Sequence, residues 1–143
     1  MKILLDTNIV LDVLLERAEW LAEAEILWEA SSDGRLSSYM TASSVTDIDY
    51  ISRRLVGSER ARQLIRRCLD DLRIIGVTAD LIEAAYARGG TDFEDDLQIV
   101  CAGAVQLDKI VTRDAAGFAN SPIPVLTPTE LIALLSSGPP SGS

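Results

Sequence analysis

The fold of this chain is decided by the stretch KILLDTN at residues 2–8. Residues 2–5 form a short apolar run that stops at Asp6, which is the pattern of a buried strand followed by a turn. A helical pattern follows, because apolar side chains recur on one side over residues 10–15. A strand that leads into a helix is the first unit of a chain in which the two kinds of element alternate.

The same alternation continues along the rest of the chain. Further strands are predicted at residues 37–41, 73–77, 109–112 and 123–126. Helices are predicted at residues 20–30, 44–55, 58–72, 79–88 and 94–107, with a last helix opened by Thr127-Pro128-Thr129-Glu130. This pattern predicts an α/β fold in which a mostly parallel sheet of four to five strands carries helices on both faces. We expect one domain over residues 1–135 and a flexible tail of Ser, Gly and Pro over residues 136–143.

The composition excludes several chemistries. The chain has 143 residues, of which 13 are Lys or Arg, 22 are Asp or Glu and none is His, for a net charge of −9. Without His there is no Ser-His-Asp triad, no Cys-His nucleophile pair and no His-ligated zinc, so any catalysis must rest on carboxylates. Cys68 and Cys101 lie among apolar residues, which predicts small buried side chains in a reducing compartment. Acids interrupt the N-terminal apolar run, so we expect a cytoplasmic protein with neither signal peptide nor membrane span.

The basic residues are unevenly distributed. A net negative charge argues against a nucleic-acid partner, because a polyphosphate would be repelled at long range. Yet seven of the 13 basic residues fall between residues 53 and 73, where the local balance is +4. The candidate contacts for RNA or a protein partner in this segment are Arg60, Arg62, Arg66 and Arg67. The alternative is an ordinary solvated helix face.

Three acids occupy positions that point to a site. Asp6 follows the first predicted strand and Asp114 follows the fourth, and ligands gather at the carboxyl ends of parallel strands. Taken singly, each is explained equally well as the cap of a following helix. Asp47 shares a helical stripe with Ile48 and Ile51, and a carboxylate on an inward-facing stripe needs a partner. The alternative is that Asp47 marks the wet edge of that stripe.

An acidic cluster, DFEDD, occupies residues 92–96 at the start of an apolar helix. Acids favour a helix N-terminus, but four acids in five residues exceed what capping requires. Helical phase does not choose among them, because the following helix is apolar on most sides. Carboxylates from four separate segments at one sheet edge indicate a hard divalent cation, Mg²⁺ or Mn²⁺. Two such ions about 4 Å apart are able to orient an attacking water for phosphoryl transfer, which needs no His.

The segments around these acids resemble those of a PIN domain, and most of all the VapC-like ribonucleases of bacterial toxin–antitoxin systems. The motifs concerned are Leu4-Leu5-Asp6-Thr7-Asn8, Ser44-Val45-Thr46-Asp47-Ile48, Asp92-Phe93-Glu94-Asp95 with Leu97-Gln98, and Ile110-Val111-Thr112-Arg113-Asp114. The likeness runs in order from residue 2 to about residue 134. Four motifs in the same order and spacing are much more specific than any one of them.

The resemblance implies a three-layer α/β/α sandwich and a metal-dependent endoribonuclease that uses Mg²⁺ or Mn²⁺ and leaves 5′-phosphate and 3′-hydroxyl ends. It places metal-binding, catalytic acids at Asp6, Asp47, Asp95 and Asp114, with Asp92 as a fifth metal ligand. It also implies that Asn8 and Thr112 support the first acid and the end of the fourth strand by hydrogen bonds. The implied partners are an RNA substrate, a cognate antitoxin and a second copy of the chain.

Two other classes of protein fit parts of the pattern. A PIN-like module that binds RNA or a protein without cleaving it would keep this fold, although the retained acids count against it. A phosphatase with an Asp nucleophile also has an acid after its first strand, but it needs another acid where this chain has Asn8. The chain departs from the family pattern at Asp96, where a small residue is common, and at Asp49, where an aromatic residue is common. Which acid of residues 92–96 binds metal therefore stays open.

Overall fold

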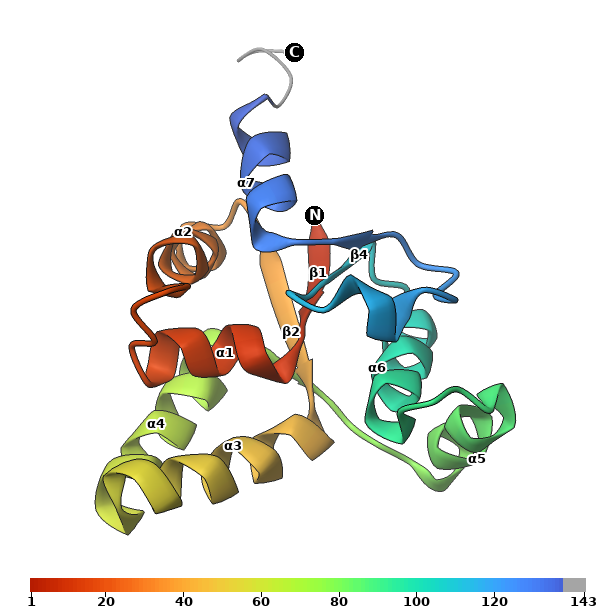
Figure 1. Ribbon diagram of the computed structural model, residues 1–143, viewed down its shortest axis with the longest axis horizontal. Helices are drawn as coiled ribbons and strands as arrows, with labels where there is room; N and C mark the ends of the chain where they lie inside the picture. The colour runs from red at the N-terminus through yellow and green to blue at the C-terminus, as the bar shows by residue number, and fades with distance from the viewer. Residues whose placement is uncertain (138–143) are drawn as a thin grey trace.

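The computed structural model describes residues 1–137 (Figure 1). Its strands are β1 (Lys2–Leu5), β2 (Ser37–Thr41), β3 (Arg73–Ile75), β4 (Lys109–Val111) and β5 (Val125–Leu126). Its helices are α1 (Thr7–Leu14), α2 (Leu21–Ser32), α3 (Ala42–Val56), α4 (Ser58–Asp71), α5 (Ala79–Arg88), α6 (Phe93–Ala104), the short η1 (Ala115–Phe118) and α7 (Pro128–Ser136). The predicted alternation of strands and helices is confirmed.

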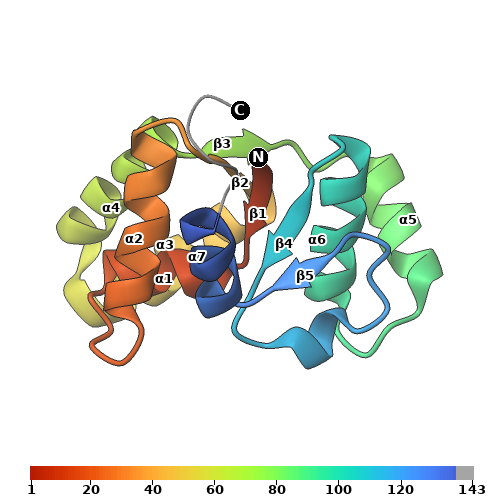
Figure 2. The same ribbon diagram turned by 90° about the horizontal axis from the view of Figure 1, so that it is seen from above.

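The strands form one parallel sheet in the order β3-β2-β1-β4-β5. The chain builds outward from β1 to β3 on one side and then returns to place β4 on the other side of β1 (Figure 2). Such a reversal leaves a crevice outside the carboxyl ends of the two central strands, where ligands bind in open α/β sheets. Asp6 follows β1 and Asp114 follows β4, so both acids belong to this edge.

The two faces of β1 show how the layers are held together. Side chains alternate across a strand, so Ile3 and Leu5 pack into a core with α1, α2, α3, α4 and α7, whereas Leu4 packs with α5, α6 and η1. All three side chains are at most 1% exposed, which explains why the strand is an unbroken apolar run. Figure 2 shows the two groups of helices on opposite sides of the sheet. The expected three-layer α/β/α sandwich is confirmed.

Helix α6 and strand β5 are both shorter than predicted. Helix α6 ends at Ala104 rather than at residue 107, because Gln106 adopts a left-handed φ of 56° through which an α-helix does not continue. Strand β5 begins at Val125 rather than at residue 123. Pro124, just before it, has no N–H to donate to the sheet, although its carbonyl still accepts from β4.

The ends of β3 and α7 also differ from the predicted ends. Strand β3 stops at Ile75, because the chain then crosses to Thr78, whose side chain caps α5. Helix α7 includes Ser136, so the predicted start of the tail at residue 136 falls inside the helix. The remainder of the predicted tail, residues 138–143, lies outside the described residues.

Two compositional predictions concern burial. Cys68 and Cys101 are both free and fully buried, as their apolar neighbours predict. Burial raises the pKa of the Cys68 thiol to about 12, so it remains an uncharged core side chain. Among residues 1–137, no helix is both long enough and apolar enough to cross a membrane.

Candidate active site

An acidic pocket of about 430 Å³ lies at the crevice between β1 and β4. Its walls come from the start of α1, one face of α3, the first turns of α6 and the segment after β4. Six carboxylates line it: Asp6, Asp47, Asp92, Glu94, Asp95 and Asp114. No lysine or arginine of residues 1–137 is among its lining residues. The structure therefore brings together all five acids predicted as metal ligands and adds Glu94.

Asp6 is the most enclosed of these acids, with 8% exposure. Its backbone N–H donates to the carbonyl of Val111 at 3.0 Å, which continues the pairing of β1 with β4. Its carboxylate accepts a hydrogen bond from Thr112 Oγ1 at 2.8 Å and another from Gln98 Nε2 at 3.2 Å. The sheet and helix α6 thus hold the first acid in one orientation.

Thr112 links two acids of the pocket. Its hydroxyl donates to Asp6 and accepts a hydrogen bond from the backbone N–H of Asp114 at 3.0 Å. This geometry matches the supporting role that the family resemblance implies for Thr112. Asn8 also lines the pocket, but its Oδ1 accepts from Arg17 Nη1 at 3.2 Å. That bond ties α1 to the following loop, which differs from the expectation that Asn8 supports Asp6.

Asp47 enters the pocket from α3 and lies against Glu94 of α6. The carboxyl of Glu94 accepts a hydrogen bond from Thr7 Oγ1 at 3.3 Å and shares another with Asp47. Burial, together with the hydrogen bond and negative charge of Asp47, raises the pKa of Glu94 to about 7. The helical stripe that made Asp47 a candidate thus ends in a contact between two acids, which either a proton or a cation must stabilise.

Asp95 is surrounded by other acids. Burial raises its pKa to about 6, and the negative charges of four neighbouring acids, Asp92 first among them, contribute to this shift. Gly117 packs directly against its carboxylate. A Cβ added at residue 117 would collide with Asp95 Oδ2 and lie 3.5 Å from Asp114 Oδ2. A residue without a side chain therefore allows the backbone of η1 to approach both acids closely.

Packing separates the remaining acids of residues 92–96. Asp92 caps α6, because its Oδ1 accepts the backbone N–H of Asp95 at 3.1 Å, and it stays at the rim of the acidic pocket. The carboxylate of Asp96 instead accepts from Arg88 Nε at 3.2 Å and from the N–H of Gly90 at 2.9 Å. Asp96 does not line the acidic pocket. Of the acids at residues 92–96, only Asp92, Glu94 and Asp95 therefore remain as candidate metal ligands.

The donor chemistry of the pocket fits a hard divalent cation. Six carboxylates without a basic neighbour repel one another, and carboxylate oxygens are ligands that Mg²⁺ and Mn²⁺ prefer. Within residues 1–137, however, no three of the acids lie close enough together to form a ready-made metal site. Mg²⁺ usually retains several waters and binds through one or two carboxylates together with substrate oxygens, so it needs fewer protein ligands than a closed metal site provides.

We expect the metal-free protein to lose stability as the pH rises from about 4 to about 7. Folding raises the pKa of Asp95 from 3.8 to about 6 and that of Glu94 from 4.5 to about 7, so the fold favours their protonated forms. This stabilisation is complete below the ordinary pKa values and is lost as the pH passes through the raised ones. Thermal unfolding in the presence of EDTA, measured at several pH values, tests the expectation.

The Glu94→Gln variant is the control for this experiment. It removes the group that titrates near neutral pH but keeps the size of the side chain, so its melting temperature should vary less with pH than that of the unchanged protein. Added Mn²⁺ should recover the stability lost at high pH, because the ion binds only the folded form. A melting temperature that stays level or rises across this range would contradict the argument.

Two site residues were not predicted to have a role. Gln98 is 1% exposed, and its Nε2 donates to Asp6, whereas its Oε1 has no hydrogen-bond partner within residues 1–137. The signal was an amide in the apolar stretch that follows residue 96. Thr7 Oγ1 lies 2.8 Å from Ser44 Oγ and 3.3 Å from Glu94 Oε1, and these two polar contacts fasten the start of α1 to α3 and α6.

The arginines predicted to contact RNA or a partner lie elsewhere on the molecule. All four are exposed on α4, and none lines the acidic pocket: Arg60, Arg62, Arg66 and Arg67. Arg62 contributes to a separate groove of about 550 Å³ between α3 and α4. Arg66 and Arg67 each form an ion pair with an acid one turn further along the helix. The acidic pocket and this basic surface are thus distinct regions.

The fold and the pocket define an α/β protein with a carboxylate site at the point where its strand order reverses. The family model of the PIN domain matches residues 2–116. The chain belongs to the PIN domain family. The search of curated proteins found no match to this sequence.

Solved structures of toxin–antitoxin proteins share the fold. VapBC2 from Rickettsia felis, bound to a promoter DNA fragment, matches with a TM-score of 0.67 and 16% identity over 89% of this chain and 98% of the other. A toxin–antitoxin complex from Klebsiella pneumoniae matches with a TM-score of 0.66 and 23% identity over 87% and 96% of the two chains. VapC20 from Mycobacterium tuberculosis, described as a sarcin-ricin loop cleaving toxin, gives a TM-score of 0.68 and 17% identity over 82% and 93%.

Proposed function

We propose that this PIN domain protein is a metal-dependent endoribonuclease and the toxin of a toxin–antitoxin pair. The observation that carries the proposal is the meeting of six carboxylates, without a lysine or arginine, in one open pocket at the reversal point of the sheet. Such a pocket suits a cation-assisted reaction on a phosphodiester, which brings further negative charge. The shared fold of the VapC and VapBC structures supports the assignment to toxins.

The residues of the acidic pocket have different proposed roles. Asp6, Asp47, Asp95 and Asp114 would hold Mg²⁺ or Mn²⁺, with Asp92 at the rim. When bound, the ion would supply positive charge against the phosphodiester and lower the pKa of the attacking water. Thr112 and Gln98 orient Asp6 by their hydrogen bonds, and Thr112 also holds the backbone of Asp114. Gly117, which has no side chain, lets the backbone of η1 pack against Asp95.

The experiment combines two readouts on the purified full chain. Calorimetry with MnCl₂ measures whether the pocket binds a divalent cation. Cleavage of RNA is then followed with Mg²⁺, with Mn²⁺ and with EDTA, and we expect cutting only with a metal and 5′-phosphate ends on the products. Binding of Mn²⁺ without RNA cleavage would contradict the proposed reaction but not the metal site. Absence of both would favour a PIN-like module that binds RNA or a protein without cleaving it.

The proposed partners are an RNA substrate, a cognate antitoxin and a second copy of this chain. Toxin–antitoxin complexes are among the solved structures of the same fold. The exposed arginines of α4 and the groove between α3 and α4 offer basic and apolar contacts to an acidic partner segment. Because this surface is separate from the acidic pocket, we assign it to the antitoxin rather than to RNA.

Charge reversal tests that assignment. In the Arg62→Glu/Arg66→Glu double variant, we expect antitoxin binding to weaken about tenfold, because two favourable contacts become repulsive. Cleavage of a short RNA should stay within about twofold, and the salt dependence of RNA binding should not change, because neither side chain reaches the acidic pocket. Antitoxin binding is measured with the co-expressed antitoxin. RNA binding is measured by anisotropy at several salt concentrations. A smaller salt slope with intact antitoxin binding would move the surface to RNA.

A further inference from the structure

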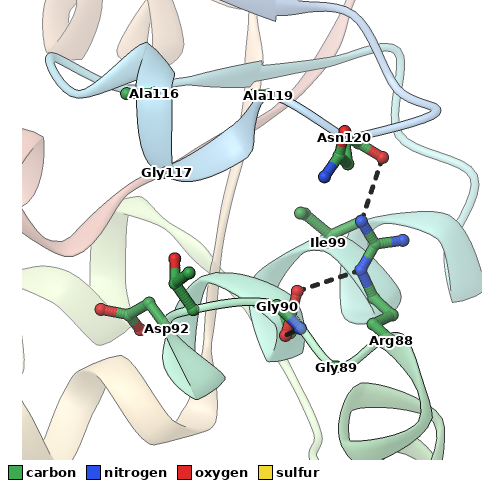
Figure 3. Close-up of a pocket in the computed structure, with 11 residues that line it drawn as sticks. Arg88, Gly89, Gly90, Asp92, Ile99, Ala116, Gly117, Ala119 and Asn120 are labelled. Atoms are coloured by element: carbon green, nitrogen blue, oxygen red, sulfur yellow. Dashed lines mark hydrogen bonds and ion pairs between the residues drawn. The ribbon is translucent and has the colours of Figure 1, made fainter.

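A second cavity of about 370 Å³ lies beside the acidic pocket (Figure 3). One wall is the loop at residues 88–92, between α5 and α6, and the other is the segment at residues 116–120. Asp92 lines both this cavity and the acidic pocket. Gly117, which also lines the cavity, packs against Asp95 and Asp114 from the other side. The two spaces are therefore neighbours that share Asp92, and Gly117 lies between the cavity and two acids of the acidic pocket.

Hydrogen bonds hold the walls of this cavity in place. Arg88 Nε donates to Asp96 at 3.2 Å, and Arg88 Nη2 donates to the backbone carbonyl of Asn120 at 3.0 Å, which fastens α5 to the segment after η1 (Figure 3). Asp96 also accepts the N–H of Gly90, where an added Cβ would lie 2.7 Å from both of its carboxylate oxygens. The cavity is thus preformed by contacts between segments far apart in the chain.

The chemistry of the cavity favours a neutral, flat ligand. Arg88 is the one basic residue of the described chain that lines it, and its charge is already compensated by Asp96. Asp92 adds negative charge, so a phosphate group would be repelled. Because two edges of the Arg88 guanidinium are engaged, the group is held as a fixed plane, and nucleobases stack on such planes. Ile99 lines the cavity but is only 3% exposed, so it offers little contact area, whereas Asn120 places an exposed side-chain amide at the rim.

From this arrangement we infer that the cavity receives one unpaired nucleobase of the RNA strand. The base stacks against Arg88, and the side-chain amide of Asn120 meets its hydrogen-bonding edge. The phosphodiester beside that nucleotide then lies at the acidic pocket, which shares Asp92 with the cavity and has two of its acids against Gly117. The inference rests on the proposed ribonuclease function and adds a base-reading position to it.

Binding without metal tests the cavity directly. The full chain, labelled with ¹⁵N and kept in EDTA, is titrated with a short unstructured RNA and followed by NMR. We expect the largest changes at the backbone amides of Gly89 and Gly90 and at the side-chain amide of Asn120. Changes confined to α4, or none at RNA concentrations that saturate cleavage, would overturn the inference. Failure of the proposed function would appear separately, as absence of cleavage by the unchanged protein with metal.

Steady-state kinetics gives a second test. Asn120→Ala keeps the backbone carbonyl that Arg88 needs but removes the amide, so KM for RNA should rise about tenfold while kcat changes by less than about threefold. The preference for one base at the cleavage site should also weaken. Gln106→Ala, which removes an exposed amide beyond the far end of α6, is the matched control and should leave KM and base preference unchanged. Equal KM and equal base preference in the two variants would refute the assignment.

Discussion

Asp6→Asn should reduce RNA cleavage by about a thousandfold, equivalent to about 4 kcal/mol of transition-state stabilisation. Asparagine has nearly the shape of aspartate and retains an acceptor oxygen for one of the two donors, Thr112 or Gln98, so the packing of the 8%-exposed side chain should survive. The loss is that of a negative charge at the centre of the pocket. That charge would bind the cation most directly, because Asp6 is the acid held most rigidly by its neighbours.

Asp33→Asn is the matched control for this variant. It makes the same chemical change at an exposed residue whose carboxylate pairs with Arg35 outside the acidic pocket, so activity should stay at that of the unchanged protein. Calorimetry should show weaker Mn²⁺ binding by Asp6→Asn only, and circular dichroism should show the same fold for both. If Asp6→Asn and Asp33→Asn cleave RNA equally well, the acidic pocket is not the active site.

Arg113→Ala should lower the free energy of unfolding by about 3 kcal/mol, the cost of leaving a buried charge without its main partner. Asp12 is completely buried in α1, and its carboxylate accepts from Arg113 Nε at 2.9 Å and Nη2 at 3.2 Å. The guanidinium of Arg113 also lies 3.6 Å from the ring centroid of Trp20. Arg17, 3.5 Å from Asp12, remains in the variant and keeps the loss at the lower end of the usual range.

Urea denaturation measures this loss, and two further variants sharpen its meaning. Arg113→Lys keeps the charge but not the paired hydrogen bonds or the stacked plane. Its free energy of unfolding should therefore lie between that of the unchanged protein and that of Arg113→Ala. Arg73→Ala removes an exposed arginine 5.9 Å from the ring of Tyr39 and should change stability by less than about 0.5 kcal/mol. A loss for Arg113→Ala no greater than that for Arg73→Ala would show that the buried ion pair contributes little.

The sequence was sufficient to predict the layers of the fold and the sheet edge that carries the acids. Strand β1 could be predicted because burial on both faces demands an unbroken apolar run. Asp6 directly follows this strand and therefore lies at the carboxyl edge of the sheet. Strands β3 and β5 were overestimated because pairing stops for reasons outside the apolar pattern, such as the missing N–H of Pro124. The order of the strands is set by tertiary packing and left no local signal.

The acids of residues 92–96 show where local reasoning stops. Helix α6 is apolar on most sides, so its own pattern could not say that Asp96 faces away from the acidic pocket. That orientation depends on Arg88, which belongs to another helix. Asp12 is a similar case, because its partner Arg113 lies 101 residues away along the chain. A buried charge is stabilised by its partner, and the periodicity of a helix does not reveal a partner that lies far away in the sequence.

The reversal of strand order has a consequence for when the acidic pocket can form during synthesis of the chain. Asp6 and Asp47 emerge early from the ribosome, but Asp114 follows β4, which must pair with β1 after all of the intervening helices have been made. A partly synthesised chain therefore has its acids apart and no complete pocket. The topology delays the proposed activity until nearly the whole domain has left the ribosome that is making it.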